Sequence, residues 1–548
     1  MWSTEQFFER YGHAYRWLAT LTAMVAAIAV VLSSTMVNVA VPAIMGEFGI
    51  DQTQAQWLST GFLAAMTVTM LMTAWGGRRF GQRGTMIVAL SVFLFGSVLG
   101  GIAPDEKVLI VSRVLQGLGA GLVQPLAMVV MFQVFPPDQR GTAMGLFGIG
   151  VVLAPALGPW VGGVLMDSFD WRFLFYLGIP FGAAGIGLAS AFLPGRKPGQ
   201  PNPALDWPAI VWLSIALLAL LQGLSSGQRL GWSSNVVVGE LVLAFVAGGG
   251  FLWHEMRAAD PLLDLRVFRN FPFAAATLVS FVLGAGLFGS TFLLPLFVQQ
   301  IQNFTPTNAG LLLMPAGFAL VLVFPLAGFL SDRVSPGLLI GFGLIVFAYS
   351  SWLMGSVDID TSFWALASWI VIGRVGLGAI FPSLSSASLK VLPPELLAQG
   401  SGTMNFIRQL GGAIGTALLV VFLERRTIFH GNVLAATQTP DNVATMAYLE
   451  GAGGALQGFG LGAAEQQGAA GSLLAQAVYF QGAAAAYRDS FLVTAAIFTA
   501  ALAPTWLLHR AQSTALKRSA GAATAMQAEA DVEAGFALEP FGSQRDSA

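Results

Sequence analysis

The sequence has no cysteine and very little charge. Without cysteine the chain can form no disulfide, no Cys-ligated zinc site and no thiol nucleophile. Only 10% of its 548 residues are charged, whereas a soluble globular domain carries roughly 25%. The net charge of −2 comes with no basic patch, so nothing indicates a nucleic-acid partner. With 55% hydrophobic residues and a mean hydropathy of +0.71, the composition predicts a membrane protein with many spans.

Residues suited to acid–base or metal chemistry are few and scattered. The histidines form no HExxH motif and no pair at i, i+4; they are His13, His254, His430 and His509. No GxxxxGK[ST] sequence occurs, which disfavours ATP as an energy source. A membrane enzyme or sensor would need clustered polar groups at one membrane face, and this sequence offers no such set. We therefore expect no enzyme activity, no metal and no cofactor.

Apolar segments predict fourteen membrane spans. At about 20 residues each, these segments are long enough to cross a bilayer as helices. The first is too long for the apolar core of a signal peptide, so we expect it to stay in the protein. The predicted spans are 17–42, 55–76, 84–103, 107–132, 141–166, 173–193, 208–225, 236–254, 272–298, 308–330, 337–355, 361–388, 400–423 and 489–508.

The distribution of positive charge predicts the orientation. If the amino terminus is cytoplasmic, 17 of the 26 lysines and arginines fall in cytoplasmic segments, six in outer segments and three within spans. This excess follows the positive-inside rule, which places both termini in the cytoplasm.

A weak internal repeat predicts two halves of six spans each. Gly117-Leu118-Gly119-Ala120 is echoed by Gly376-Leu377-Gly378-Ala379, and other pairs follow in the same order at an offset of about 255 residues. The predicted organisation is a cytoplasmic N-terminus (1–16), a first half (17–193), a cytoplasmic linker (194–207), two inserted spans (208–254), a second half (255–508) with a periplasmic loop (424–488), and a disordered cytoplasmic tail (509–548).

The fifth span carries a stripe of small residues. Gly150, Ala154, Gly158 and Gly162 recur every four residues, so another helix can approach closely. Pro155 and Pro159 interrupt the helical hydrogen bonds in the same stretch. The simplest interpretation is a packing helix of any membrane protein. The more specific one is a close, bent contact between the two halves.

Two charged motifs predict functional positions. Arg113 lies well inside the fourth span, where a charge costs at least ~2.5 kcal/mol, so it should face the bundle interior or a water-filled cavity unless it snorkels outward. Asp332 and Arg333 end a span, where an acid–base pair can latch neighbouring helices. In the corresponding loop of the first half the acidic position is Arg78, so no matching latch is expected there.

Several of these strings resemble motifs of the major facilitator superfamily. Gly158-Pro159-x-x-Gly162-Gly163 resembles the antiporter motif, Arg113-x-x-Gln116-Gly117-x-Gly119 the fourth-helix motif, and Gly328-x-Leu330-Ser331-Asp332-Arg333 the inter-helix loop motif. The first span, through Asn38 and Pro42, is similar to that of the fourteen-span EmrB/QacA drug:proton antiporters. The implied fold is all-α, with two six-helix pseudo-repeats and two inserted helices.

The resemblance implies export of amphipathic small molecules in exchange for protons from a bacterial inner membrane. It also implies a periplasmic adaptor of the EmrA/HlyD type and an outer-membrane channel. Expected substrate contacts are Asn38, Trp57, Gln116, Gln124, Phe292, Gln299 and Asn405. Expected coupling or gating residues are Arg113, Ser33, Gly158, Pro159, Gly162, Gly163, Asp332, Arg333 and Arg408.

One departure from that group keeps an alternative open. Ser33 occupies the position where the group has an aspartate, and no Asp or Glu lies deep in any predicted span. The natural proton carrier is therefore missing. If coupling has been lost, a lipid, lysophospholipid or fatty-acid transporter on the same fold becomes the alternative, whereas an importer is disfavoured by the antiporter motif.

Overall fold

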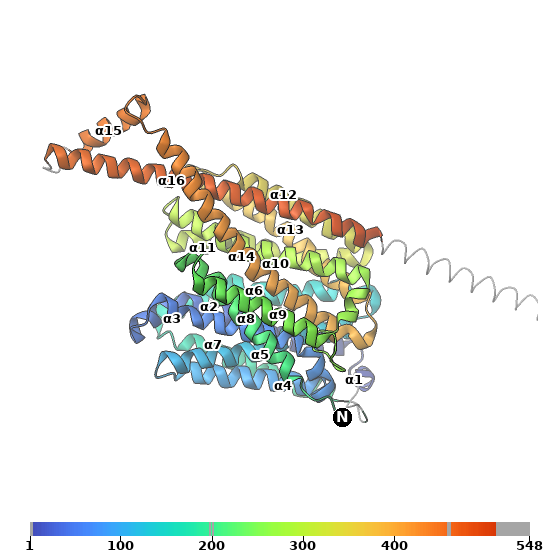
Figure 1. Ribbon diagram of the computed structural model, residues 1–548. Helices are drawn as coiled ribbons and strands as arrows, with labels where there is room; N and C mark the ends of the chain where they lie inside the picture. Colours follow the sequence, from blue (N-terminus) through green and yellow to red (C-terminus); the bar gives the residue numbers. More distant parts are fainter. Residues whose placement is uncertain (1–3, 197–198, 200–201, 457–461, 511–548) are drawn as a thin grey trace, which may run out of the picture.

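The computed structural model describes residues 4–196, 199, 202–456 and 462–510, and these residues contain helices but no β-strand. Long helices run back and forth between two ends of a bundle (Figure 1). In chain order the helices are α1 (Thr4–Tyr11), α2 (Ala14–Phe48), α3 (Gln52–Leu71), α4 (Thr73–Gly101), α5 (Glu106–Val134), α6 (Arg140–Ser168), α7 (Phe173–Phe192), α8 (Trp207–Leu230), α9 (Asn235–Glu255), α10 (Phe271–Gln300), α11 (Pro306–Arg333), α12 (Pro336–Met354), α13 (Phe363–Lys390), α14 (Leu397–Ala436), α15 (Val443–Leu456) and α16 (Ala463–Ala500).

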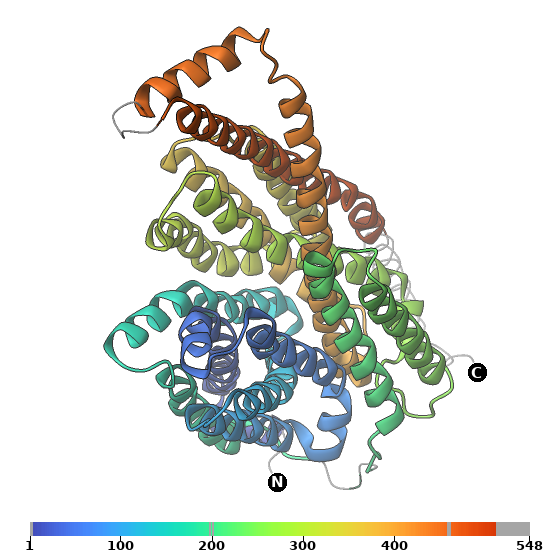
Figure 2. The same cartoon turned by 60° about the vertical axis from the view of Figure 1, so that its left-hand side comes forward.

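The helices form two groups that lie side by side. Helices α2–α7 make the first half, and α10–α14 with α16 make the second (Figure 2). The inserted pair, α8 and α9, packs as a hairpin whose first helix contacts both α3 of the first half and α14 of the second. The hairpin therefore lies along a side where the two halves meet.

Each predicted span falls on a helix of the bundle. Twelve helices among the described residues are long and apolar enough to cross a membrane. The other two predicted spans, 55–76 and 141–166, fall on α3 with the start of α4 and on α6. The all-helical membrane architecture is thus confirmed, while the count of fourteen spans stays a prediction.

The turn between the second and third spans depends on one glycine. Gly81 has φ +72°, which favours glycine, and it splits α4 into two helical pieces that reverse the chain. A Cβ at this position would also lie 2.5 Å from the amide nitrogen of Arg196. The Arg83 amide donates to the Pro194 carbonyl at 3.1 Å, so the linker after α7 packs directly on this turn.

The described residues of the segment 424–488 are mainly helical, whereas its composition indicated a loop. Helices α14 and α16 continue beyond the rest of the bundle and carry α15 between them (Figure 1). Alanine has the highest helix propensity, so an alanine-rich segment can extend a helix as readily as it can form a linker. Of the predicted disordered tail, residues 511–548 lie outside the described residues.

Candidate functional site

The fourth-span arginine is buried and bonded on three sides. Arg113 in α5 is 1% exposed; its Nε donates to the Leu58 carbonyl at 3.1 Å and its Nη1 to Gln116 Oε1 at 2.7 Å. The Ser33 carbonyl of α2 lies 3.5 Å from Nη1, and the guanidinium sits 4.2 Å from the centre of the Phe62 ring. The side chain therefore faces the interior and ties α2, α3 and α5 together. The alternative of snorkelling is wrong.

No carboxylate neutralises this arginine within the described part of the chain. Ser33, in the expected acidic position, is 3% exposed, and its hydroxyl has no hydrogen-bond partner among the described residues. Gln116 extends this hydrogen-bond network to α4, because its side-chain amide donates to Ser97 Oγ at 2.9 Å. Arg113 is thus held by neutral oxygens, which leaves its charge uncompensated. The side chain of Asn38 lies outside the described residues.

Asp332 bonds across the contact between the two halves. The carboxylate at the end of α11 accepts from the amides of Gly141 and Thr142, at 2.6 and 2.7 Å, and from the Thr142 hydroxyl at 2.8 Å. The N-cap residue of α6, Gln139, makes no capping hydrogen bond with its own side chain. Asp332 therefore supplies a cap across the interface, where the helix dipole favours an anion.

Arg333 is not part of this latch. Its side chain is exposed and stacks on Phe329, 4.1 Å from the ring centre. The cation beside Asp332 is instead Lys390, at the end of α13, whose Nζ lies 3.6 Å from the carboxylate. Asp332 and Arg333 thus have different partners because neighbouring residues on a helix point to different faces.

Replacing Asp332 with asparagine should loosen this contact. The substitution removes the charge from hydrogen bonds that are worth about 1.5–3 kcal/mol each when one partner is ionised. We expect at least a fivefold faster thiol labelling of a cysteine at Ser401, which is fully buried on α14 where it meets α5. The chain has no other thiol. Asp360→Asn, an exposed acid, is the matched control and should leave the rate unchanged; equal rates in both variants would contradict the latch.

The backbones of α6 and α11 touch next to the latch. A Cβ on Gly145 would lie 2.5 Å from the Phe324 carbonyl oxygen, and one on Gly328 would lie 2.5 Å from the Gly141 carbonyl oxygen. Contacts this close between the halves are possible only because these positions are glycine. We call the end of the bundle that carries this contact, together with the α5–α6, α11–α12 and α13–α14 connections, the closed end.

The glycine stripe predicted for this contact lies elsewhere on the same helix. A Cβ on Gly158 would lie 2.4 Å from Thr35 Oγ1, and one on Gly162 would lie 3.7 Å from Met36, so the stripe packs against α2 of the same half. The expectation that it joins the halves is therefore wrong, because small residues permit a close approach without choosing the partner. Pro159 and Gly163 lie in α6, and their surroundings fall outside the described residues.

Helix α14 completes the closed end. Its Ser401 hydroxyl donates to the Pro125 carbonyl of α5 at 2.9 Å, and a Cβ on Gly402 would lie 2.5 Å from the Met70 carbonyl oxygen of α3. Asn405 is 1% exposed and bonds to the Ser401 carbonyl and to Arg408. The Arg408 guanidinium lies 4.7 Å from the Phe381 ring centre. In this conformation Asn405 and Arg408 thus belong to a packed interface.

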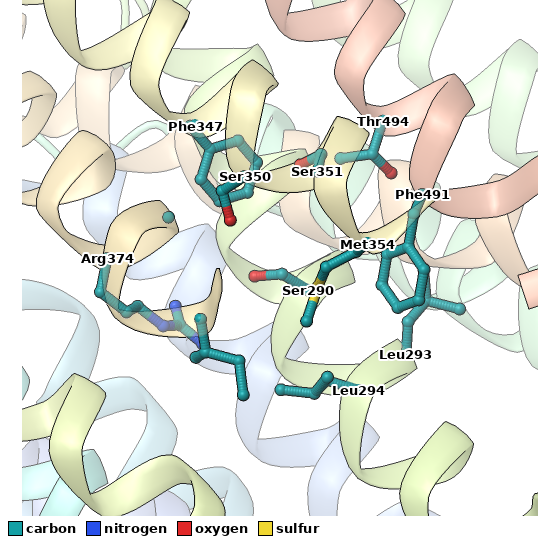
Figure 3. Close-up of a pocket in the computed structure, with 12 residues that line it drawn as sticks. Ser290, Leu293, Leu294, Phe347, Ser350, Ser351, Met354, Arg374, Phe491 and Thr494 are labelled. Atoms are coloured by element: carbon teal, nitrogen blue, oxygen red, sulfur yellow. The ribbon is translucent and has the colours of Figure 1, made fainter. Parts of the chain in front are cut away.

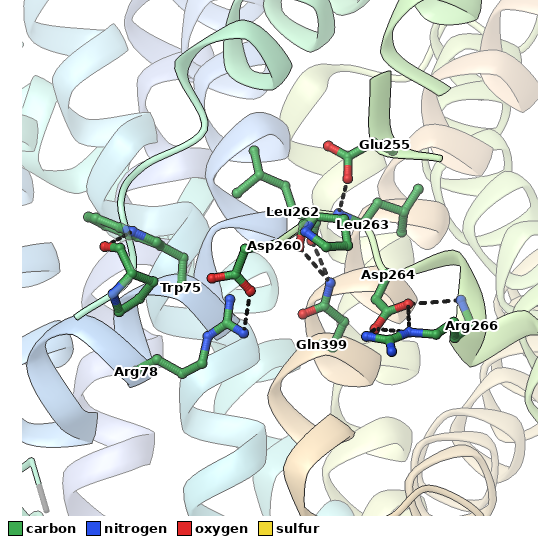
Figure 4. Close-up of polar contacts among 11 residues, drawn as sticks. Trp75, Arg78, Glu255, Asp260, Leu262, Leu263, Asp264, Arg266 and Gln399 are labelled. Carbon is green, nitrogen blue, oxygen red and sulfur yellow. Dashed lines mark hydrogen bonds and ion pairs between the residues drawn. The ribbon is translucent and has the colours of Figure 1, made fainter. Parts of the chain in front are cut away.

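The segment that follows α9 also contributes to the closed end. It does so at Arg78, the position where an acidic residue was expected in the first half. Arg78 forms a 2.8 Å ion pair with Asp260, which follows α9 (Figure 4). From the start of α14, Gln399 donates to the Leu262 carbonyl at 2.7 Å. The segment after α9 therefore contacts the first-half turn and the second-half helix together.

Helix α9 ends on a buried acid that the sequence analysis did not single out. Glu255, the last residue of α9, is 4% exposed and accepts from the Leu263 amide at 3.0 Å, while its other oxygen has no partner among the described residues (Figure 4). Nearby, Arg266 lowers the pKa of Asp264 through a direct hydrogen bond. An i, i+1 His-Glu pair at a span end was the available signal for Glu255.

At the opposite end, described ion pairs join helices within one half. Glu47 bonds to Arg172 at 2.7 Å, linking α2 to α7, and the bonds from Arg172 and Trp171 hold the pKa of Glu47 below its usual range. In the second half Arg426 and His430 of α14 pair with Asp489 of α16. These contacts stiffen each half separately, so the half-to-half contacts described above can change without breaking them.

The predicted substrate contacts do not gather in one place. Gln116, Gln124 and Asn405 are buried in helix contacts, Trp57 is half-buried, and Phe292 and Gln299 are exposed on α10. A small cavity opens instead within the second half, between α10, α12, α13 and α16 (Figure 3). Its walls include Arg374, an arginine within a span for which the sequence indicated no role.

Comparisons with known proteins agree on one family. A family model described as Major Facilitator Superfamily matches residues 23–416. The chain is 31% identical to the "Multidrug resistance protein B homolog" of Mycobacterium tuberculosis, covering 74% of this chain and 75% of that protein. It is 29% identical to the "Multidrug export protein EmrB" of Escherichia coli, covering 89% and 94%. Its fold is similar to that of the human organic anion transporter MFSD10, with a TM-score of 0.56, 15% identity, and coverage of 90% of this chain and 99% of that one.

Proposed function

The chain belongs to the major facilitator superfamily, and we propose that it exports amphipathic small molecules from the cytoplasm by alternating access, in exchange for protons. Family membership makes the protein a multi-pass membrane transporter and not an enzyme. Relatives at about 30% identity are named as multidrug exporters or resistance proteins, which supports efflux over uptake.

The contact between the halves is the observation that carries this proposal. The latch from Asp332 to the start of α6 and the glycine contact beside it are local, and both can separate without unfolding a helix. Each half keeps its own ion pairs at the opposite end. Such a structure can rock one half against the other around a midplane site, as alternating access requires.

The predicted orientation assigns the closed end to one side of the membrane. The closed end carries Arg78, Arg79, Arg83 and Arg140, and the positive-inside rule assigns it to the cytoplasm of a bacterial inner membrane, with both termini on that side. This conformation would then be open outward, ready to release substrate. A periplasmic adaptor and an outer-membrane channel would be the partners expected of an EmrB-like pump.

Lipid or lysophospholipid transport is the second candidate. It is favoured by Ser33 at the expected acidic position and by the lack of a carboxylate ion pair at Arg113 among the described residues. Without a carboxylate that can exchange a proton, a carrier would work as a facilitator.

Transport by purified protein in proteoliposomes tests both candidates. Two dyes with the same fluorophore and opposite charge, dansyl-aminoundecanoic acid and dansylcadaverine, are compared with a fluorescent lysophospholipid, with and without an imposed pH gradient. Gradient-dependent movement of a dye supports proton-coupled export. Movement of the lysophospholipid alone, without dependence on the gradient, would contradict it and support the second candidate.

A further inference from the structure

Arg374 lies in α13 at the wall of a small, mainly apolar cavity. Four hydroxyl side chains line the same space: Ser290 of α10, Ser350 and Ser351 of α12, and Thr494 of α16 (Figure 3). The cavity volume is about 30 Å³. A single water needs roughly 10–15 Å³ by this measure, so the space fits a head group of a few atoms and not a whole drug-sized molecule.

The charge of Arg374 has no counter-ion in the described part of the chain. The one hydrogen bond that its side chain makes there runs from Nη2 to Thr291 Oγ1, at 3.2 Å, and no carboxylate lines the cavity. A guanidinium has five N–H donors, so most of its capacity is unused. An unpaired charge inside the membrane is unfavourable, and an incoming anion would reduce that cost.

The other two arginines within spans are more fully engaged. Arg113 is bonded to two carbonyls and Gln116 and lies over Phe62. Arg408 bonds to Asn405 of its own helix and lies over the Phe381 ring of α13. Arg374 has fewer such contacts: one hydrogen bond, to Thr291 of α10, which leaves four of its five N–H donors without a partner among the described residues.

An apolar groove adjoins the cavity. It lies between α10, α14 and α16, has a volume of about 320 Å³, and is lined by Phe281, Val282, Ala285, Gly286, Ile414, Gly415, Leu418, Leu419, Phe422, Val493, Thr494, Ile497 and Phe498. Thr494 belongs to the walls of both spaces, and Phe347 of the cavity contacts Phe498 of the groove with ring centres 4.2 Å apart. A volume near 300 Å³ is at the lower end of small-molecule sites.

We propose that Arg374 recognises the anionic group of an amphipathic substrate whose apolar body occupies the adjoining groove. The substrate class is then a carboxylate, sulfonate or phosphate ester on an apolar body. The cavity offers such a group one guanidinium and the hydroxyl of Ser351, because the hydroxyls of Ser290, Ser350 and Thr494 already donate to main-chain carbonyls. Among the described residues that line it, no carboxylate is present to bind a cation. This inference deepens the proposed export function and rests on it only for the direction of transport.

Binding of the two dansyl dyes to the full-length protein in phosphatidylcholine nanodiscs tests this assignment. We expect the wild type to bind dansyl-aminoundecanoic acid more tightly than dansylcadaverine. Arg374→Gln should weaken binding of the acid at least tenfold and leave the amine unchanged, and Arg374→Lys should keep part of the affinity because it keeps the charge. Arg425→Gln, an exposed arginine of α14 outside both spaces, is the matched control and should change neither affinity.

Three results would overturn the assignment: tighter binding of the amine by the wild type, equal weakening of both dyes by Arg374→Gln, or no weakening of the acid. Equal weakening would mean that Arg374 only maintains the structure. Repeating the titration with phosphatidylglycerol in the nanodisc identifies the source of the anion. Competition by this lipid, lost in Arg374→Gln, would assign the site to a lipid head group, and its absence would assign it to a dissolved molecule.

The binding assay and the transport assay test the two proposals independently. Selective binding of the acid without any gradient-driven movement would contradict the export proposal and leave the role of Arg374 standing. Gradient-driven movement of the amine, with no Arg374-dependent binding of the acid, would do the reverse.

Discussion

Adding a single methyl group at Gly328 is expected to reduce transport five- to 100-fold. In the Gly328→Ala variant the new Cβ would lie 2.5 Å from the Gly141 carbonyl oxygen and 2.8 Å from the Gly145 Cα, both of them backbone atoms of α6. Neither atom can rotate away, so α6 and α11 must separate. Overpacking of this kind costs about 1–3 kcal/mol, and this cost applies only to the conformation in which the closed end is formed.

Transport in proteoliposomes and thiol labelling at the closed end measure this effect. Gly341→Ala in α12 is the matched control, because a Cβ there meets nothing within 4 Å. Alanine is a better helix former than glycine by about 0.5–1 kcal/mol, so the control should be neutral or slightly stabilising. The interpretation fails if Gly328→Ala transports at the wild-type rate, or if both variants lose transport equally.

Arg113→Ala is expected to lower gradient-driven transport by about 100-fold or more. The change removes the donors to the Leu58 carbonyl and Gln116, and hydrogen bonds from a charged group contribute about 1.5–3 kcal/mol each. It also removes the buried positive charge that lies between α2, α3 and α5. Any protonation step that depends on the field of this charge would be lost with it.

Two further substitutions separate the charge of Arg113 from its geometry. Arg113→Lys keeps the charge but cannot hold both partners at once, so we expect intermediate transport. Ser33→Asp adds a carboxylate on α2, whose backbone carbonyl at this position lies 3.5 Å from the arginine, and should increase the dependence on pH. Full gradient-driven transport by Arg113→Ala would show that this network serves packing only. Size-exclusion profiles identify any variant that fails to fold.

Sequence reasoning located the membrane helices because its signals are local. Hydropathy is averaged over about 20 consecutive residues, and the cost of burying a charge depends on the span that contains it, so both can be evaluated from a short stretch of sequence. For this reason the helices, the short loop between the second and third spans and the interior position of Arg113 could all be predicted. The helical extension at 424–488 could not, because alanine-rich composition is compatible with both a linker and a long helix.

Residue contacts over long sequence distances depended on the tertiary structure. Asp332 bonds to Gly141, which lies 191 positions away in the sequence. The residues around either one do not indicate that the two will be in contact. The stripe from Gly150 to Gly162 showed that α6 can be approached closely, yet packing decided that α2 fills it and that α11 meets the glycines nearer the start of the helix. Arg374 was visible as a charge within a span, but only the folding of α10, α12, α13 and α16 around it placed four hydroxyls beside it and no acid. The sequence by itself determined which segments form membrane helices and which charges are buried, since these follow from composition. The partner of each side chain follows from the packing of helices far apart in the chain, so only the tertiary structure decided it.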